Sequence, residues 1–247
     1  MRSSLVSSWA GGDQAYRRMF ERKAADAHAF EPGLLSIISR PIAISLSEEY
    51  LNSSVRLMIM GQETHKLQDA MTGLDPVRTY LEGVASYRRF DFAEGGEPAQ
   101  RRSPFWTAFR RVCREFDVAE PRGAAWSNLV KVQCSSGGSA AFTAIPNEHR
   151  DTLLEWQREL FEAELSYARP KKLMLFTGPR YDWILRRMMP DLELRDVPGI
   201  RARKLQVGRS QAFGCDVVRT YHPAYLRRRR DEAFVSDAAR ILAQFRT

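Results

Sequence analysis

The chain has 247 residues, 44% of them hydrophobic and 28% charged, so it is long and apolar enough to bury one large core. Thirty-eight Lys and Arg residues against thirty Asp and Glu give a net charge of +8, which favours a polyanionic partner such as nucleic acid. The sequence contains no run of about 18 apolar residues and no signal-peptide pattern. We therefore expect a cytoplasmic protein without a membrane partner.

The three cysteines, Cys113, Cys134 and Cys215, lie far apart and form no C-x-x-C pair. This spacing indicates neither a disulfide framework nor a zinc or iron–sulfur site. We expect the cysteines to be small buried side chains, and we expect no metal and no cofactor.

The first half of the chain mixes helical patterns with one apolar strand. The helices are expected to begin at capping Asp and Ser residues or at prolines. The expected elements are a helix from 13 toward 28, an apolar continuation at 30–38, a helical segment at 47–51, a strand at 55–60, and helices at 76–87 and 104–116.

The second half alternates strands with helices. The expected elements are a strand at 124–132, a long amphipathic helix at 148–167, a strand at 172–177, a helix at about 181–189, a short strand at 204–207, a strand at 215–220, and a closing helix from about 229. This alternation predicts one three-layer α/β domain with a mostly parallel central sheet of about four strands. We expect residues 1–50 to be an N-terminal helical extension of that domain.

Polar side chains occur at three of the predicted strands. Gln62, Glu63 and His65 follow the first strand, Asn128 stands in the second, and His222 follows the last. Because parallel sheets bind ligands at the carboxyl ends of their strands, we expect these groups to converge. The alternative is that the polar groups after the first strand are a solvated turn, and that the asparagine amide binds only the protein's own backbone.

This constellation resembles the uracil-DNA glycosylase superfamily. The family motif Gly-Gln-Asp-Pro-Tyr is similar to residues 61–65, Gly-Gln-Glu-Thr-His, and the His-Pro-Ser-Pro-Leu loop is similar to residues 222–226, His-Pro-Ala-Tyr-Leu. The strand asparagine of the family matches Asn128 in Ser-Asn-Leu-Val-Lys-Val, a segment also similar to that of the iron–sulfur members, whose four cysteines are missing here. The resemblance covers roughly residues 50–245 and is closest to divergent bacterial members with a Gly-Gln-Glu-Thr motif.

The resemblance implies a monofunctional DNA glycosylase that hydrolyses the N-glycosidic bond of a deaminated or modified pyrimidine flipped out of DNA. It assigns catalysis to Glu63 and His222, and base binding to Gln62, His65 and Asn128. The chemistry agrees with these residue types, because bond cleavage builds positive charge on the sugar and negative charge on the departing base. A glutamate replaces the family aspartate, so the alternative is a weak or inactive nucleic-acid-binding protein of the same fold.

The base pocket needs an aromatic ring that stacks on the base. The sequence offers four candidates without ranking them, namely Tyr80, Tyr87, Phe90 and Phe92. His65 stands where strict uracil enzymes have a tyrosine that blocks the 5-methyl group of thymine. Its smaller ring predicts tolerance of 5-substituted pyrimidines.

The segment after His222 is the expected grip on DNA. The resemblance makes Leu226 a wedge that fills the gap left by the flipped nucleotide, whereas the alternative is a core residue at a helix start. The residues that follow it, and that can hold phosphates or form a solvated helix end, are Arg227, Arg228, Arg229 and Arg230. We expect a monomer in the bacterial nucleoid, and both DNA repair and defence against modified foreign DNA stay open.

A third interpretation is a nucleotide or phosphate enzyme with a doubly wound sheet. It is weaker because no strand in the sequence leads into a G-x-G-x-x-G or P-loop motif.

Overall fold

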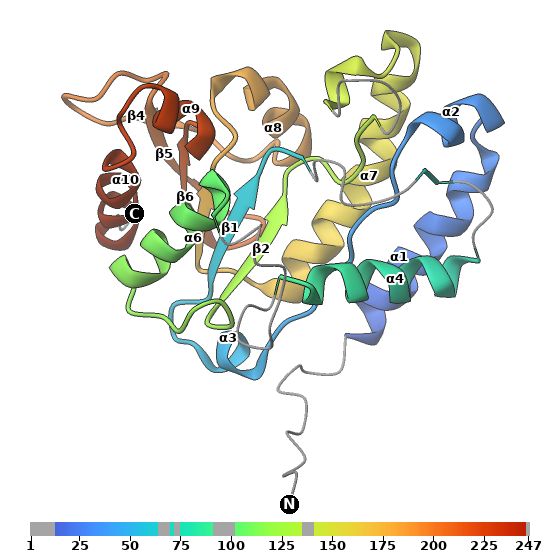
Figure 1. Cartoon of the computed structure of the whole chain (residues 1–247), viewed down its shortest axis with the longest axis horizontal. Helices are drawn as coiled ribbons and strands as arrows, with labels where there is room; N and C mark the ends of the chain where they lie inside the picture. Colours follow the sequence, from blue (N-terminus) through green and yellow to red (C-terminus); the bar gives the residue numbers. More distant parts are fainter. Residues whose placement is uncertain (1–12, 64–69, 72–74, 91–101, 135–140, 246–247) are drawn as a thin grey trace, which may run out of the picture.

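The computed structural model describes residues 13–63, 70–71, 75–90, 102–134 and 141–245. Its elements alternate along the chain as Figure 1 shows, and their bounds are α1 (Gln14–Asp26), η1 (Ala27–Ala29), α2 (Pro32–Ile37), α3 (Glu48–Asn52), β1 (Leu57–Gly61), α4 (Pro76–Arg88), α6 (Pro104–Glu115), β2 (Ala124–Asn128), η3 (Phe142–Ala144), α7 (Asn147–Ala168), β3 (Lys172–Leu175), η4 (Pro179–Tyr181), α8 (Asp182–Met188), β4 (Arg195–Asp196), β5 (Leu205–Ser210), β6 (Cys215–Thr220), α9 (Pro223–Arg228) and α10 (Phe234–Gln244).

The fold is a three-layer α/β architecture around one mostly parallel sheet. The strand order is β2-β1-β3-β6-β5-β4. The first four of these strands are parallel, β5 runs antiparallel to β6, and β4 runs antiparallel to β5. The expected class is confirmed, but the sheet has six strands rather than about four. One of the additional strands is β4 at the edge of the sheet. Its two residues are exposed and polar, so the sequence shows no apolar pattern that would predict a strand there.

The central strands are buried because helices cover both faces of the sheet. Every residue of β1 and of β6 is buried, as expected for strands enclosed in a parallel sheet. Helices α6 and α10 pack together on one face, where α10 also contacts β3 and β6. Helix α7 lies on the other side of the sheet, where α1 and α8 pack against it (Figure 1).

The helix starts follow the expected capping chemistry. Asp13 Oδ1 accepts from the backbone N–H of Ala15 at 2.6 Å, and Ser103 Oγ accepts from that of Trp106 at 3.3 Å. Both side chains satisfy backbone donors that have no partner within the helix. Helix α1 then packs against α4 and α7, so the N-terminal segment is part of the packed core.

Two boundaries differ from the expectations. Strand β2 ends at Asn128 rather than near 132, although Leu129 and Val130 still donate to backbone carbonyls of the β1 end at 3.0 Å each. The closing helix begins at Phe234, and a separate short helix, α9, precedes it. Helix α9 begins at Pro223, a residue suited to the first helical position.

The arrowheads of β1 and β2 point to the edge of the molecule at which α8 and α9 lie (Figure 1). After β1 the chain forms β2, which lies beside β1 on one side. It then crosses to form β3, which lies beside β1 on the other side. The sheet therefore has its topological switch point between β1 and β3, where open α/β sheets form binding crevices. In the described ranges, no helix is long and apolar enough to cross a membrane.

Candidate active site

Gly61 closes β1 at a point where only glycine fits. A Cβ atom placed on it would lie 2.6 Å from the side-chain amide of Asn128 and 3.3 Å from the ring of Phe105. Gly61 also stands opposite Asn128 in the parallel register. The absence of a side chain at Gly61 thus allows the Asn128 amide and the Phe105 ring to pack against the end of β1.

The amide of Asn128 is held by the backbone. In the orientation that satisfies its hydrogen bonds, the amide nitrogen donates to the carbonyl oxygens of Glu63 at 3.1 Å and of Ser127 at 3.3 Å. Asn128 is buried, with 8% of its surface exposed. Protein groups therefore supply partners for its donor side, which is one of the alternatives left open by the sequence.

The carboxylate of Glu63 has one partner for each oxygen. Oε2 accepts from the backbone N–H of Phe142 at 2.6 Å, and Oε1 accepts from the hydroxyl of Tyr181. Burial raises the pKa of Glu63 above its ordinary value of 4.5, while the two hydrogen bonds act in the opposite direction. Glu63 is thus a partly buried carboxyl group held in one orientation, a common property of catalytic acids and bases.

Gln62 joins two strand ends. Its Nε2 donates to the backbone carbonyl of Thr177, directly after β3, at 2.7 Å. This bond spans the switch point between β1 and β3. Gly178 follows with a positive φ of 69°, a conformation that favours glycine, and turns the chain toward Tyr181.

His222 caps helix α9. Its Nδ1 accepts from the backbone N–H of Ala224 at 3.2 Å. An accepting Nδ1 carries no proton, so the neutral imidazole bears its proton on Nε2. The cap therefore sets the tautomer that can donate a hydrogen bond from Nε2.

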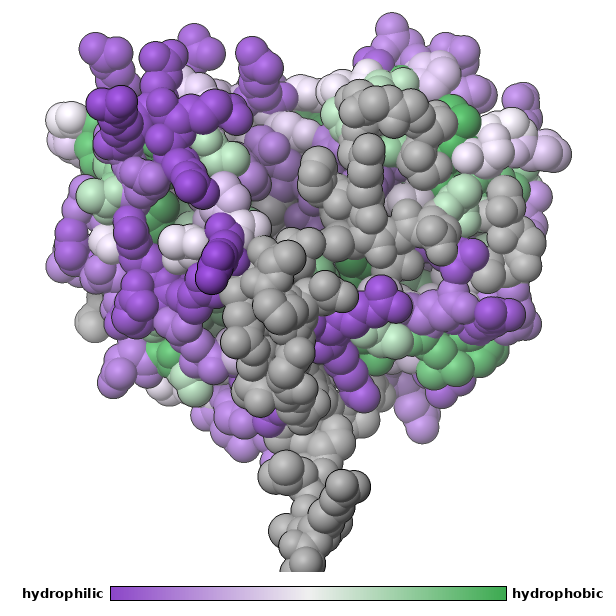
Figure 2. All heavy atoms as spheres, viewed as in Figure 1, coloured by the Kyte–Doolittle hydropathy of each residue, from purple (hydrophilic) through white to green (hydrophobic). Residues whose placement is uncertain are grey.

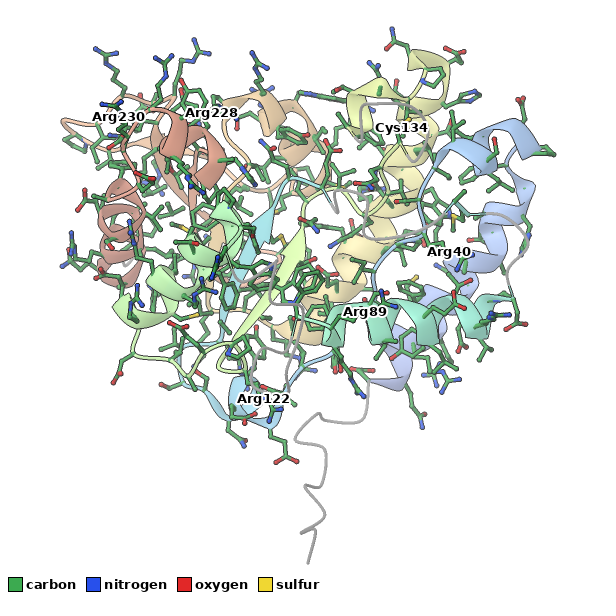
Figure 3. All side chains as sticks on the ribbon, in the orientation of Figure 1. Arg40, Arg89, Arg122, Cys134, Arg228 and Arg230 are labelled. Atoms are coloured by element: carbon green, nitrogen blue, oxygen red, sulfur yellow. The ribbon has the colours of Figure 1, made fainter. Side chains whose placement is uncertain are left out.

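A groove of about 870 Å³ lies at these strand ends, and it receives both Gln62 and His222. A second hollow of about 600 Å³ continues it, since Arg203, Tyr221, Tyr225 and Arg229 line both. The basic residues along the two are Arg180, Arg201, Arg203, Lys204, Arg228 and Arg229. Strongly hydrophilic side chains gather over α9 and β4 (Figure 2), and Figure 3 shows Arg228 and Arg230 beside α9 at this edge.

The residues predicted to contact DNA differ in their exposure. Arg227, Arg228, Arg229 and Arg230 are all exposed, and two of them line the groove. Leu226 instead has 1% of its surface exposed and belongs to the core. A wedge must reach solvent before it can enter a duplex, so in this conformation Leu226 fits the alternative of a core residue.

Three of the four aromatic candidates for stacking do not line the groove. Tyr80, Tyr87 and Phe90 are buried in the core, and Phe92 lies outside the described residues, as does His65. A ring that the sequence did not single out, Phe105 on the first turn of α6, lies against Gly61 at the end of β1 and is not among the residues that line the groove. A local signal existed in Ser103 and Pro104, which predict a helix start there, but nothing in the sequence placed that start beside β1.

Tyr181 was also missed as a site residue. It follows β3 by the same rule that selected Glu63 and His222, because it comes after the carboxyl end of a parallel strand. Burial and the neighbouring Glu63 raise the pKa of Tyr181 well above its ordinary range, so the phenol stays protonated and acts as a donor.

No protein-family model matches the chain, and no curated protein sequence matches it.

Proposed function

We propose that the protein is a monofunctional DNA glycosylase that removes a deaminated or modified pyrimidine. The observation that carries this proposal is the meeting of Gln62, His222 and the Tyr181–Glu63 pair, from three strand ends, at one arginine-rich groove. A fixed carboxylate, an imidazole donor and a surface for phosphates are the parts that hydrolysis of an N-glycosidic bond in DNA requires. We further propose that it acts on DNA as a monomer in the bacterial cytoplasm, without metal or cofactor.

In this mechanism Glu63 acts at the sugar. As a carboxylate it stabilises the positive charge that develops as the bond to the base breaks, and it orients or deprotonates the attacking water. Tyr181 and the backbone N–H of Phe142 each bind one of its oxygens. Each carboxylate oxygen accepts more than one hydrogen bond, so a water molecule can still bind there.

His222 acts at the base. A neutral imidazole with its proton on Nε2 donates a hydrogen bond to a carbonyl oxygen of the pyrimidine, whose negative charge grows as the base departs. The capping bond from Ala224 keeps the other ring nitrogen occupied and thus holds the ring in this tautomer.

Gln62, Asn128 and Phe105 complete the proposed base pocket. The Gln62 amide is oriented by Thr177, and the Asn128 amide by the Glu63 carbonyl. The ring of Phe105 packs beside both β1 and the asparagine, which makes it our candidate for stacking on the base. His65 keeps its predicted role at carbon 5 of the pyrimidine.

The competing function is nucleic-acid binding without catalysis. The hydrogen bonds from Tyr181 and Phe142 to both oxygens of Glu63 favour it, because an engaged carboxylate is a poorer base. Both functions use the same groove, so binding alone does not separate them.

The test is base release from oligonucleotides that carry uracil or 5-substituted pyrimidines, for wild type and Glu63→Gln. The matched control is Glu49→Gln, an exposed glutamate on α3 at the opposite end of the sheet. We expect wild type and the control to release a base. We expect Glu63→Gln to bind DNA without releasing a base, because the negative charge of Glu63 acts mainly in the transition state. Tight binding by wild type with no release of any base would instead establish the competing function.

A further inference from the structure

The groove exposes aromatic rings to solvent. In the described ranges, three large apolar side chains are exposed, and they are Val77 and Leu81 on α4 and Trp183 on α8. Only Trp183, 36% exposed, lines the groove. Large exposed rings at a concave surface mark binding sites more often than single exposed aliphatic residues do.

Two tyrosines form a second aromatic surface in the same groove. The rings of Tyr221 and Tyr225 lie 4.4 Å apart between centroids and are tilted by 35°. Arg229 Nε donates to the Tyr225 hydroxyl at 3.3 Å, and its guanidinium lies 5.5 Å from the ring centroid. The pair is therefore held in place by its own contacts and lines both hollows.

Most of the basic groups beside these rings have no carboxylate partner among the residues that the structure describes. In the described part of the chain, no ion pair within 4.0 Å involves Arg180, Arg201, Arg203, Arg228 or Arg229. Lys204 differs, since it pairs with Asp231 at 2.8 Å. Uncompensated guanidinium groups in a concave surface attract a polyanion.

The backbone that carries Arg203 is held by hydrogen bonds from a buried side chain. The buried side chain of Arg219 on β6 donates to the carbonyl oxygens of Ala202 and Arg203 at 3.2 and 3.1 Å. It also pairs with Asp182 at 3.1 Å, next to Tyr181 and Trp183. One buried guanidinium thus fixes both walls of the groove relative to β6.

We propose that this groove binds single-stranded DNA, with bases stacked on Trp183 and on the Tyr221–Tyr225 pair and phosphates held by the arginines between them. Alternating rings and cations are the means by which proteins hold single strands, because every base has a face that stacks. Leu226 is buried and offers no wedge to fill a gap in a duplex. This inference rests on the proposed function, because it names the form of DNA that the proposed site binds. It concerns binding alone, which can be measured whether or not a base is released.

The first experiment measures fluorescence anisotropy of labelled oligonucleotides of about 12 nucleotides, within the site sizes of such grooves. Three probes are compared, namely a single strand, its duplex, and an abasic strand of the same length. We expect wild type to bind the single strand at least about fivefold more tightly than its duplex. We expect it to bind the single strand at least about 25-fold more tightly than the abasic strand, because each of the two stacking surfaces contributes about fivefold or more.

The variants Trp183→Ala and Tyr225→Ala should each reduce the preference over the abasic strand by about fivefold or more. The control Leu81→Ala removes an exposed apolar side chain, 53% exposed, from α4 and should leave the preference unchanged. An intact preference in both groove variants would overturn the stacking surface, and duplex binding equal to or tighter than single-strand binding would overturn the choice of substrate.

The arginines have a separate readout. Replacement of Arg203 and Arg228 by Ser should flatten the dependence of log affinity on log salt while leaving the preference over the abasic strand. The matched control is Arg18→Ser with Arg78→Ser, exposed arginines on α1 and α4. An unchanged salt slope would show that the groove arginines do not contact phosphate.

The same proteins distinguish this inference from the proposed function. Single-strand binding that depends on the rings, without base release, would leave the inference standing and refute the glycosylase. Base release from duplex only, unaffected by Trp183→Ala and Tyr225→Ala, would leave the glycosylase standing and refute the single-strand inference.

Discussion

The hydroxyl of Tyr181 donates a hydrogen bond to the carboxylate of Glu63, which lies 118 residues earlier in the chain. The bond joins the turn after β3 to the end of β1, so it crosses the switch point of the sheet beside the bond from Gln62 to Thr177. Tyr181 lines the groove, and Glu63 is half-buried beside it. The tyrosine therefore helps to hold the Glu63 carboxylate in one orientation at the edge of the groove.

Tyr181→Phe should shift the pH dependence of base release toward higher pH. The hydroxyl stabilises the ionised form of Glu63, so its removal raises the pKa of that carboxyl group further above the ordinary 4.5. Activity that requires the carboxylate then appears only at higher pH. Single-turnover rates across pH, with Tyr225→Phe as the control, test this expectation, and superimposable profiles for wild type and Tyr181→Phe would refute it.

Glu63 should make wild type less stable as pH rises. Its folded-state pKa is raised by burial, so the folded protein binds the proton more tightly than the unfolded chain does. Stability is then lost as pH rises from the ordinary pKa of 4.5 through the raised value. Urea midpoints of wild type should fall relative to those of Glu63→Gln across this window. Parallel curves for the two proteins would mean that the carboxyl group is not desolvated.

His222→Asn separates the two roles of the histidine. Asparagine is a good helix cap, so α9 should keep its start, while the donor on Nε2 is lost. We expect base release to fall by about 10²–10³-fold with little change in thermal midpoint. His222→Ala should lose the same activity and also about 1 kcal/mol of stability. Base release by His222→Asn within a few-fold of wild type would restrict the histidine to capping.

Gly61→Ala should destabilise the protein by roughly 1–3 kcal/mol, because the added methyl group would stand 2.6 Å from the Asn128 amide. The control is Gly33→Ala in helix α2, where a Cβ meets nothing within 4 Å and the change should be neutral or stabilising by up to about 1 kcal/mol. Urea unfolding measures both. Equal stability of Gly61→Ala and wild type would show that the amide is not packed against the strand.

Local pattern was sufficient for most of the elements. The apolar runs of β1, β3 and β6 and the capped starts of α1, α4 and α6 follow from near-neighbour chemistry, and they predict the three-layer class. The edge strand β4 was missed because its two exposed residues are held by pairing with β5 alone. Helix α9 was missed because a six-residue helix gives too short a pattern to recognise.

The candidate site likewise contains residues that the sequence could predict and residues that it could not. Local pattern alone places Gln62, Glu63 and His222 after strand ends, and parallel strands bring their carboxyl ends to one edge whatever lies between them. Three features could not be predicted without the folded structure: Leu226 lies in the core, Phe105 packs against Gly61, and Tyr181 contacts Glu63. Those outcomes depend on how a helix is rotated and on which distant segment packs beside it, and contacts between residues far apart in the chain are set by packing of the whole core rather than by local pattern.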